Sequence, residues 1–293
     1  MTFLSYLING ISLGSVYAII ALGYTMVYGI AKMLNFAHGD VIMIGCYTVF
    51  LTMTKVDMNP VLSTVLAIVV CTVLGVVIEK IAYKPLRKAT SLAVLITAIG
   101  VSYFLQNIAL ILFGSNTVSF SSVITWKGVS LAGGDLNISG VTIVTIVSCL
   151  VIMAVLMIFI RKTKSGQAML AVSEDKDAAQ LMGVDVNKTI SLTFAIGSGL
   201  AAIAGVLLCS AYPALTPYTG SMPGIKAFTA AVFGGIGSIP GALVGGILLG
   251  IIEILSRAYI STQLADAIVF AVLIIVLLVK PTGILGKQIH EKV

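Results

Sequence analysis

The sequence predicts an all-α membrane protein, a bundle of eight or nine transmembrane helices with a broken or re-entrant segment, forming one domain over residues 1–293. Three observations predict it: composition, the length of the apolar segments and the placement of basic residues. Of the residues, 59% are hydrophobic and 10% charged, whereas soluble domains are about 25% charged. The mean hydropathy is +1.13. The hydrophobic core of a soluble domain could not bury this much apolar surface, but the hydrocarbon of a lipid bilayer can cover it.

The apolar segments have the length of membrane-crossing helices, which need about 20 apolar residues to cross roughly 30 Å of hydrocarbon. Eight segments qualify: 8–30, 40–54, 60–79, 92–113, 138–160, 189–211, 241–257 and 264–280. A ninth, at 224–236, is shorter and contains Lys226. It is either a short crossing or a half-helix that enters the membrane and returns. Barrel strands would instead show about ten residues of alternation each.

Basic residues predict the orientation. Ten of the seventeen lie in 80–88, in 161–164 and in the tail from Lys280 onward. The positive-inside rule places these stretches in the cytoplasm. The loop at about 114–137 carries only Lys127 and Asp135 as charged residues and is expected outside. An external N-terminus and a cytoplasmic C-terminus follow. They require an odd number of crossings, which favours a ninth crossing at 224–236.

Several chemistries are excluded by the residues present. The net charge of +6 is spread over loops, where it suits topology and anionic lipid rather than nucleic acid. The four cysteines stand singly within apolar segments, which favours packing over disulfides or metal. The sequence around Gly286 lacks the spacing of a phosphate loop, and the two histidines, His38 and His290, form no catalytic set. We therefore expect no catalytic residue and no cofactor bound by this chain.

The loop at about 161–188 is the sharpest local feature. Ser173 is predicted to cap a short helix of about 174–182, with acidic residues in its first turn and Gly183 as its stop. This helix is either a solvated connector or a docking element for a cytosolic partner. The candidate docking residues are Glu174, Asp175, Asp177, Ala178, Ala179 and Gly183.

Polar residues within apolar segments are costly and suggest a transport path. The candidates are Asn35, His38, Asp40, Asn107 and Lys226. Structural alternatives exist for three of them: Asp40 as a helix cap, Lys226 with its ammonium extended to the membrane surface, and His38 at the interface. Glu253 and Arg257 stand four residues apart and are expected to neutralise each other on one helix.

Glycine spacing predicts close helix contacts. Gly10 and Gly14, Gly241 and Gly245, and Gly246 and Gly250 each share a helical face. The glycine-rich stretch 234–241 interrupts helical geometry, and packing and a role in the transport path are both open for it.

Several motifs resemble the permeases of branched-chain amino acid ABC importers, of the LivH type. They include Asn35-Phe-Ala-His-Gly-Asp40, the stretch 226–241 from Lys226 to Gly241, and Lys280-Pro-Thr-Gly-Ile-Leu-Gly286. Asp177-Ala178-Ala179-xxx-Gly183 has the EAA-xxx-G layout that such permeases present to their ATPase, with Asp in place of Glu. The likeness extends over nearly the whole chain.

The resemblance implies a multi-pass subunit of the bacterial cytoplasmic membrane that imports leucine, isoleucine or valine. It implies a second, related permease, two ATPase subunits that use ATP and Mg²⁺, and an extracytoplasmic binding protein as partners. This chain would then not be an enzyme. The alternative is an ion-coupled secondary amino-acid transporter or a channel, which would need no ATPase.

Overall fold

The structure is a computed structural model that describes residues 2–87, 89–131 and 136–286. Eleven α-helices are described: α1 (Thr2–Ala31), α2 (His38–Lys55), α3 (Pro60–Ile78), α4 (Ser91–Phe113), α5 (Gly140–Lys162), α6 (Lys164–Glu174), α7 (Lys176–Leu181), α8 (Val186–Ala211), α9 (Ser221–Gly234), α10 (Ile239–Tyr259) and α11 (Ala265–Val279). A π-helical turn, η1 (Glu79–Tyr83), and a 3₁₀ turn, η2 (Lys84–Leu86), continue α3.

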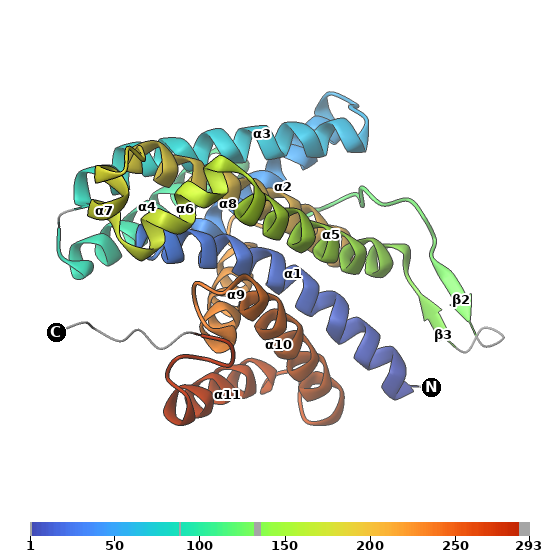
Figure 1. Ribbon diagram of the computed structural model, residues 1–293. Helices are drawn as coiled ribbons and strands as arrows, with labels where there is room; N and C mark the ends of the chain where they lie inside the picture. The colour runs from blue at the N-terminus through green and yellow to red at the C-terminus, as the bar shows by residue number, and fades with distance from the viewer. Residues whose placement is uncertain (1, 88, 132–135, 287–293) are drawn as a thin grey trace.

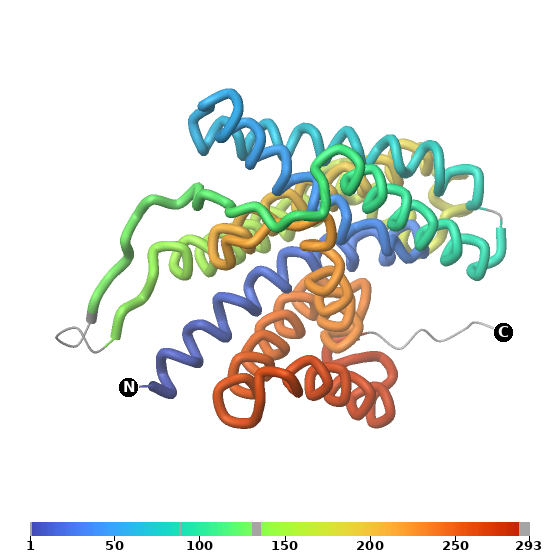
Figure 2. The backbone as a smooth tube through the Cα atoms, turned by 180° about the vertical axis from the view of Figure 1, so that it is seen from behind, coloured from blue at the N-terminus to red at the C-terminus, as the bar shows by residue number. Residues whose placement is uncertain are grey.

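Helix α1 is the centre of the bundle. It packs against α10, α8, α9 and α5, and its residues from Ser12 to Val27 are buried. Helices α2, α3 and α8 form a group on one side of it, while α9, α10 and α11 form a second group on the other (Figure 1). The N-terminal end of α1 lies at one end of the bundle, and α6 and α7 lie at the opposite end (Figure 1, Figure 2).

Six helices are long and apolar enough to cross a membrane: α1, α3 with its η1 and η2 extension, α4, α5, α8 and α10. Helix α11 is apolar but only 15 residues long, and α9 has 14 residues. The prediction of an all-α polytopic membrane protein is confirmed. The finer prediction of eight or nine crossings stays a prediction, because α2, α9 and α11 do not meet the same measure of length and hydropathy.

The segment between α4 and α5 contains short strands that the sequence did not reveal. Strand β1 (Val118–Ser119) pairs antiparallel with β4 (Ala214–Leu215), and β2 (Val129–Leu131) pairs antiparallel with β3 (Leu136–Ile138). The first pair ties the loop to the end of α8, and the second lies at the same end of the bundle as the start of α1 (Figure 1).

Several charged residues used in the orientation argument lie outside the described residues. They are Lys88, Asp135, Lys287 and Lys292, together with His290 and the C-terminus at Val293.

Glycines let the central helices touch backbone to backbone. A Cβ added at Gly250 of α10 would lie 2.2 Å from the backbone nitrogen of Gly14 on α1. A Cβ added at Gly246 would lie 2.5 Å from the backbone nitrogen of Ala18. The packing role predicted for the Gly-xxx-Gly pairs is therefore confirmed for α1 and α10. Such close approach lets dispersion forces act along the whole contact.

The glycine-rich stretch 234–241 forms the turn between α9 and α10. Gly235 and Gly237 have φ values of +106° and +92°, which side chains with a Cβ rarely adopt. The segment after α11 returns to this turn, where the N–H groups of Ile284 and Leu285 each donate to a carbonyl at the end of α9, at 2.9 Å. The two stretches 226–241 and 280–286 are thus one packed unit.

The tight contact between α1 and α10 predicts the effect of one methyl group. Gly250→Ala forces the two backbones apart, and we expect it to lower the free energy of unfolding by about 1–3 kcal/mol. Thermal unfolding of the purified protein in detergent measures this. Gly100→Ala is the matched control, since an added Cβ there meets nothing within 4 Å. Equal unfolding temperatures for the two variants would contradict the packing role.

Candidate functional site

Helix α7 is held in place by capping at both ends. Asp175 caps it, because its Oδ1 accepts the N–H groups of Asp177 and Ala178, each at 2.9 Å. The cap predicted at Ser173 is wrong: Ser173 lies within α6, and its hydroxyl donates to the carbonyl of Leu170 at 2.7 Å. The predicted helix of about 174–182 is correspondingly shorter, at Lys176–Leu181, because α6 continues through Glu174.

The end of α7 presents two apolar side chains to solvent. Gly183 has a φ of +86° and stops the helix as predicted, while the N–H of Val184 bonds back to the carbonyl of Ala179 at 3.0 Å. Ala179 is buried, but Leu181 and Met182 are 89% and 85% exposed. The acidic residues predicted for docking, Glu174, Asp175 and Asp177, are exposed, as is Ala178.

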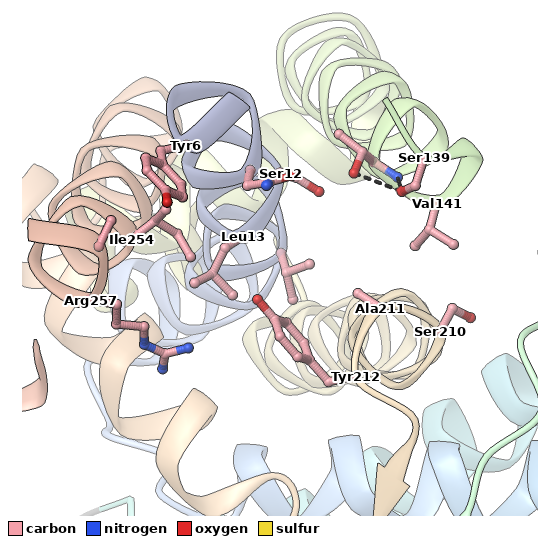
Figure 3. Close-up of a pocket in the computed structure, with 14 residues that line it drawn as sticks. Tyr6, Ser12, Leu13, Ser139, Val141, Ser210, Ala211, Tyr212, Ile254 and Arg257 are labelled. Carbon is pink, nitrogen blue, oxygen red and sulfur yellow. Dashed lines mark hydrogen bonds between the residues drawn. The ribbon is translucent and has the colours of Figure 1, made fainter. Parts of the chain in front are cut away.

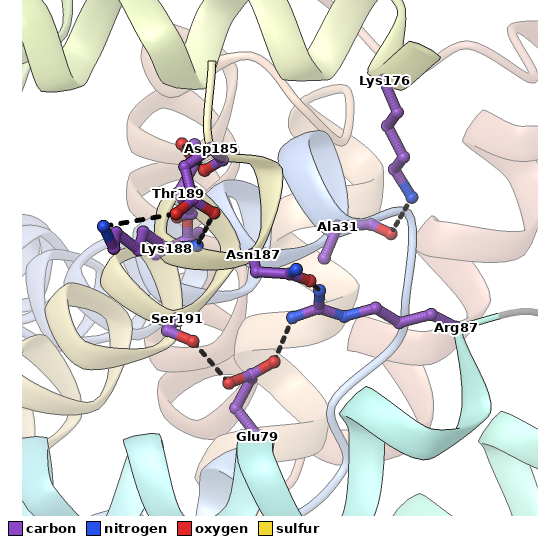
Figure 4. A network of polar contacts seen from close by, with 10 residues as sticks. Ala31, Glu79, Arg87, Lys176, Asp185, Asn187, Lys188, Thr189 and Ser191 are labelled. Atoms are coloured by element: carbon purple, nitrogen blue, oxygen red, sulfur yellow. Dashed lines mark hydrogen bonds and ion pairs between the residues drawn. The ribbon is translucent and has the colours of Figure 1, made fainter. Parts of the chain in front are cut away.

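A polar network joins α7 to the ends of the membrane helices (Figure 4). The ammonium of Lys176 donates to the carbonyl of Ala31, the last residue of α1, at 2.8 Å. Burial lowers the pKa of Lys176, and the nearby positive charges of Arg87 and Lys32 lower it further. This hydrogen bond ties α7 to the end of α1.

The same network includes a buried carboxylate. Glu79, in η1, is fully buried, pairs with Arg87 and accepts the hydroxyl of Ser191 on α8 at 2.6 Å. Arg87 also donates to Asn187 at the start of α8. Lys80 and Lys84 stand close to Glu79 in the sequence, but the cation partner of Glu79 in the structure is Arg87.

Asp185 caps α8 at the other side of this loop. Its Oδ1 accepts the N–H of Lys188 at 3.0 Å, and this hydrogen bond lowers the pKa of the carboxyl group. An ionised carboxylate at the first turn favours the helix through the helix dipole.

Two of the predicted path residues, Asn35 and His38, are packed into the core. Asn35 Oδ1 accepts the hydroxyl of Tyr83 at 3.0 Å. The His38 ring is 1% exposed and packs edge-on against Tyr24, with centroids 4.7 Å apart. The His38 side chain is therefore enclosed by protein, and neither residue lines the two cavities described below.

Asp40 is buried beside a cavity of about 260 Å³. It lies in the first turn of α2 but does not cap it, since the N-cap residue is Ala37 and Asp40 Oδ1 accepts from Gln106 Nε2 at 2.9 Å. Gln106 also lies within hydrogen-bond distance of Ser102 and Ser221. The cavity is thus bordered by polar groups from α2, α4 and α9.

The polar partner of Asp40 on α4 is Gln106 and not the predicted Asn107. Asn107 is exposed, and its amide donates to the carbonyl of Tyr103 within the same helix, at 2.7 Å. One residue along a helix turns a side chain by about 100°, so Gln106 and Asn107 face different sides of α4.

Lys226 is the centre of a buried ion network. Its ammonium lies 2.8 Å from Glu253 Oε1 and 2.6 Å from Asp266 Oδ1. Glu253 also pairs with Arg257, as predicted, and accepts the hydroxyl of Tyr17 at 2.8 Å. Lys226 is 4% exposed and so does not extend to the membrane surface. The network joins α1, α9, α10 and α11, and its four charges sum to zero.

A larger cavity of about 760 Å³ lies between the N-terminal parts of α1 and α5 and the C-terminal ends of α8 and α10. Tyr6, Ser12 and Leu13 line it from α1, and Arg257 of α10 and Tyr212, the residue after α8, also face it (Figure 3). Its wall includes Ser210, whose buried hydroxyl has no hydrogen-bond partner among the described residues. None of the predicted path residues lines this cavity.

Comparisons with known proteins give one consistent result. The family described as "Branched-chain amino acid transport system / permease component" matches residues 6–277. The high-affinity branched-chain amino acid transport system permease protein LivH of Escherichia coli K12 is 48% identical over 99% of this chain and 98% of its own length. The corresponding protein BraD of Pseudomonas aeruginosa is 43% identical over the same shares.

One more distant relative also matches over most of both chains. A probable LivH permease of Methanocaldococcus jannaschii is 30% identical over 92% of this chain and 88% of its own length. Among solved structures, PsaBC from Streptococcus pneumoniae in complex with Fab aligns over 96% of this chain and 93% of its own, with 16% identity and a TM-score of 0.47.

The ion network predicts strongly coupled mutations. Lys226→Met leaves Asp266 without its cation and weakens the neutralisation of Glu253, so we expect a loss of up to about 3–5 kcal/mol in the free energy of unfolding. Glu253→Gln leaves Arg257 without its carboxylate and leaves Lys226 with Asp266 alone, and it is expected to cost a similar amount. The double variant should lose less than the sum, by about 0.5–3 kcal/mol. Additive losses in detergent unfolding would contradict the network.

Proposed function

Because the chain belongs to the family of branched-chain amino acid transport permeases, we propose that it forms the membrane pathway of an ATP-driven importer of leucine, isoleucine and valine. The observation that carries the coupling part of the proposal is the exposed end of α7. Leu181 and Met182 are 89% and 85% exposed, and Leu181 stands two residues after the sequence Asp177-Ala178-Ala179. Water is a poor environment for two neighbouring apolar side chains, whereas a groove on a partner protein would bury them.

The mechanism we propose is mechanical. Two ATPase subunits bind ATP and Mg²⁺, close, and push on α7. Helix α7 passes the displacement to α1 through the bond between Lys176 and Ala31, and to α8 through the short link that follows Gly183. Both α1 and α8 are central helices, so their tilt changes which side of the pathway is open. The chain itself acts as a transport subunit and not as an enzyme.

We place α6 and α7 in the cytoplasm, and the start of α1 and the β2–β3 hairpin outside. The basic residues Arg161, Lys162 and Lys164 beside α6 support this orientation through the positive-inside rule. Helices α2 and α9 then act as half-helices whose N-terminal turns meet inside the membrane. A Cβ added at Gly39 would lie 2.6 Å from the carbonyl oxygen of Gly220. We propose that α11 crosses and that α9 crosses only in part.

The partners we propose are a second, related permease, two ATPase subunits and an extracytoplasmic binding protein. The unpaired apolar surface of α3, α4 and α5 supports contact with lipid and with the second permease, since these helices are 22–28% buried across their most apolar stretches. The binding protein would deliver the amino acid to the outer ends of the helices.

Co-purification tests this assembly. Tagged protein extracted in mild detergent should bring down a second permease and an ATPase, which mass spectrometry identifies. A homo-oligomer that contains neither partner, obtained under conditions that preserve a known ABC complex, would contradict the proposal and favour an ion-coupled transporter or channel.

The exposed end of α7 predicts a docking defect without misfolding. We expect Leu181→Asp with Met182→Asp to remove the ATPase from the purified complex and to abolish ATP-dependent uptake, because charged side chains cannot enter an apolar groove without a large desolvation cost. The second permease should still co-purify. Val56→Asp, at a residue 64% exposed in the loop between α2 and α3, is the matched control and should leave the ATPase bound.

The backbone at Gly183 gives a second test of the same element. Gly183→Arg places a bulky residue at a φ of +86°, which costs about 1–2 kcal/mol locally and shifts the end of α7. Uptake should fall severalfold while the permease pair remains intact. Unchanged uptake by a normally assembled complex would exclude this loop from coupling.

A further inference from the structure

Three carboxylates are almost completely buried among the described residues, and only two of them have a cation. Glu79 pairs with Arg87, and Glu253 pairs with both Lys226 and Arg257. Asp40 is 2% exposed, yet within the described parts of the chain no basic nitrogen lies within 4.0 Å of it. An isolated buried carboxylate is costly, and in membranes it marks a functional group.

The carboxylate of Asp40 is only half satisfied. Its Oδ1 accepts the amide of Gln106, but its Oδ2 is buried and accepts no hydrogen bond from any described residue. Asp40 lines the cavity of about 260 Å³, so a small molecule in this space reaches the carboxylate. Neither Glu79 nor Glu253 lines this cavity or the larger one.

We propose that this cavity binds the primary ammonium group of the amino acid during translocation, with Asp40 as its counter-ion. The inference rests on the proposed import function and deepens it. An amino acid is a zwitterion in water, and its ammonium group can donate three hydrogen bonds. Asp40 Oδ2 accepts one, and Ser102 and Ser221 offer hydroxyl oxygens from the neighbouring helices. The site thus supplies a negative charge for the ammonium group, which a hydrocarbon environment cannot supply.

The position and the walls of the cavity suit a passing apolar amino acid. Ser102 lies eleven residues after Ser91, in the middle of the 23-residue helix α4, so the site is near the centre of that span. Ile99, Tyr103 and Ile225 form apolar walls beside the carboxylate. The volume is below the range of about 300–1,000 Å³ that is typical of pockets for drug-sized ligands, as a small substrate requires.

Thiol protection tests occupancy of the cavity directly. Ile225, which lines the cavity and is 43% exposed, is replaced by cysteine in the full complex without its binding protein. The four native cysteines are buried, and the parent complex gives their background labelling. Millimolar leucine should slow labelling by N-ethylmaleimide, whereas 4-methyl-2-oxopentanoate, which has leucine's side chain but no ammonium group, should not. Equal protection by both compounds would overturn the proposal.

Substitution of Asp40 completes the test. With Asp40→Asn in the Ile225→Cys background, leucine should no longer protect, and the KM for uptake should rise about 10- to 100-fold, the range expected for a lost charge-assisted hydrogen bond. Gln106→Ala should give a smaller rise, and Asn107→Ala, on the exposed face of the same helix, should give none. Retained protection in Asp40→Asn would overturn the inference.

Two controls separate this inference from the import function. Complexes carrying Asp40→Asn must retain the second permease and the ATPase; loss of the permease would make Asp40 an interface residue and overturn the inference. Uptake by the parent complex is measured in the same vesicles. Absence of ATP-dependent uptake there contradicts the import function, whereas normal parent uptake with an unchanged KM for Asp40→Asn contradicts only the ammonium site.

Discussion

Gly250 of α10 lies so close to Gly14 of α1 that no side chain fits between the two backbones, and the rest of the bundle is arranged around this contact. It holds the α9–α10–α11 group against the central helix. Helix backbones also approach this closely at two other contacts, between Gly245 and Ala230 and between Gly39 and Gly220. In lipid, where no hydrophobic driving force draws helices together, close packing of this kind is a main source of helix association.

Close packing also decides which charges the membrane part of the protein can hold. Because α9 and α10 touch through glycines, the ammonium of Lys226 reaches Glu253 at 2.8 Å, and Tyr17 of α1 completes the hydrogen bonds of that carboxylate. Glu79 is neutralised in a similar way by Arg87. Asp40 differs from these two carboxylates. The N-terminal turn of its helix meets the N-terminal turn of α9, and this contact places a hydroxyl group and a cavity near the carboxylate but no cation from the described residues.

The sequence was sufficient for the class of fold, for most of the helices and for the position of the loop that contains α7, since these depend on local hydropathy, charge and glycine. It predicted the pair of Glu253 and Arg257, which one helix brings together. It missed Gln106, Asp266 and Tyr17, because their partners are distant along the chain and nothing local indicates which face of a helix meets another. The cap at Asp175 was missed for a different reason: Ser173 and Asp175 are both good capping residues, and the packing of α6 decided between them.

We propose that this chain carries branched-chain amino acids through a membrane when ATP is hydrolysed by other subunits. Uptake of radiolabelled leucine is measured in proteoliposomes that contain the complete complex, with the binding protein and ATP each supplied on the side of the membrane where it acts. We expect uptake that needs ATP and the binding protein and that persists when ion gradients are dissipated. Uptake that follows an ion gradient and ignores ATP would contradict it.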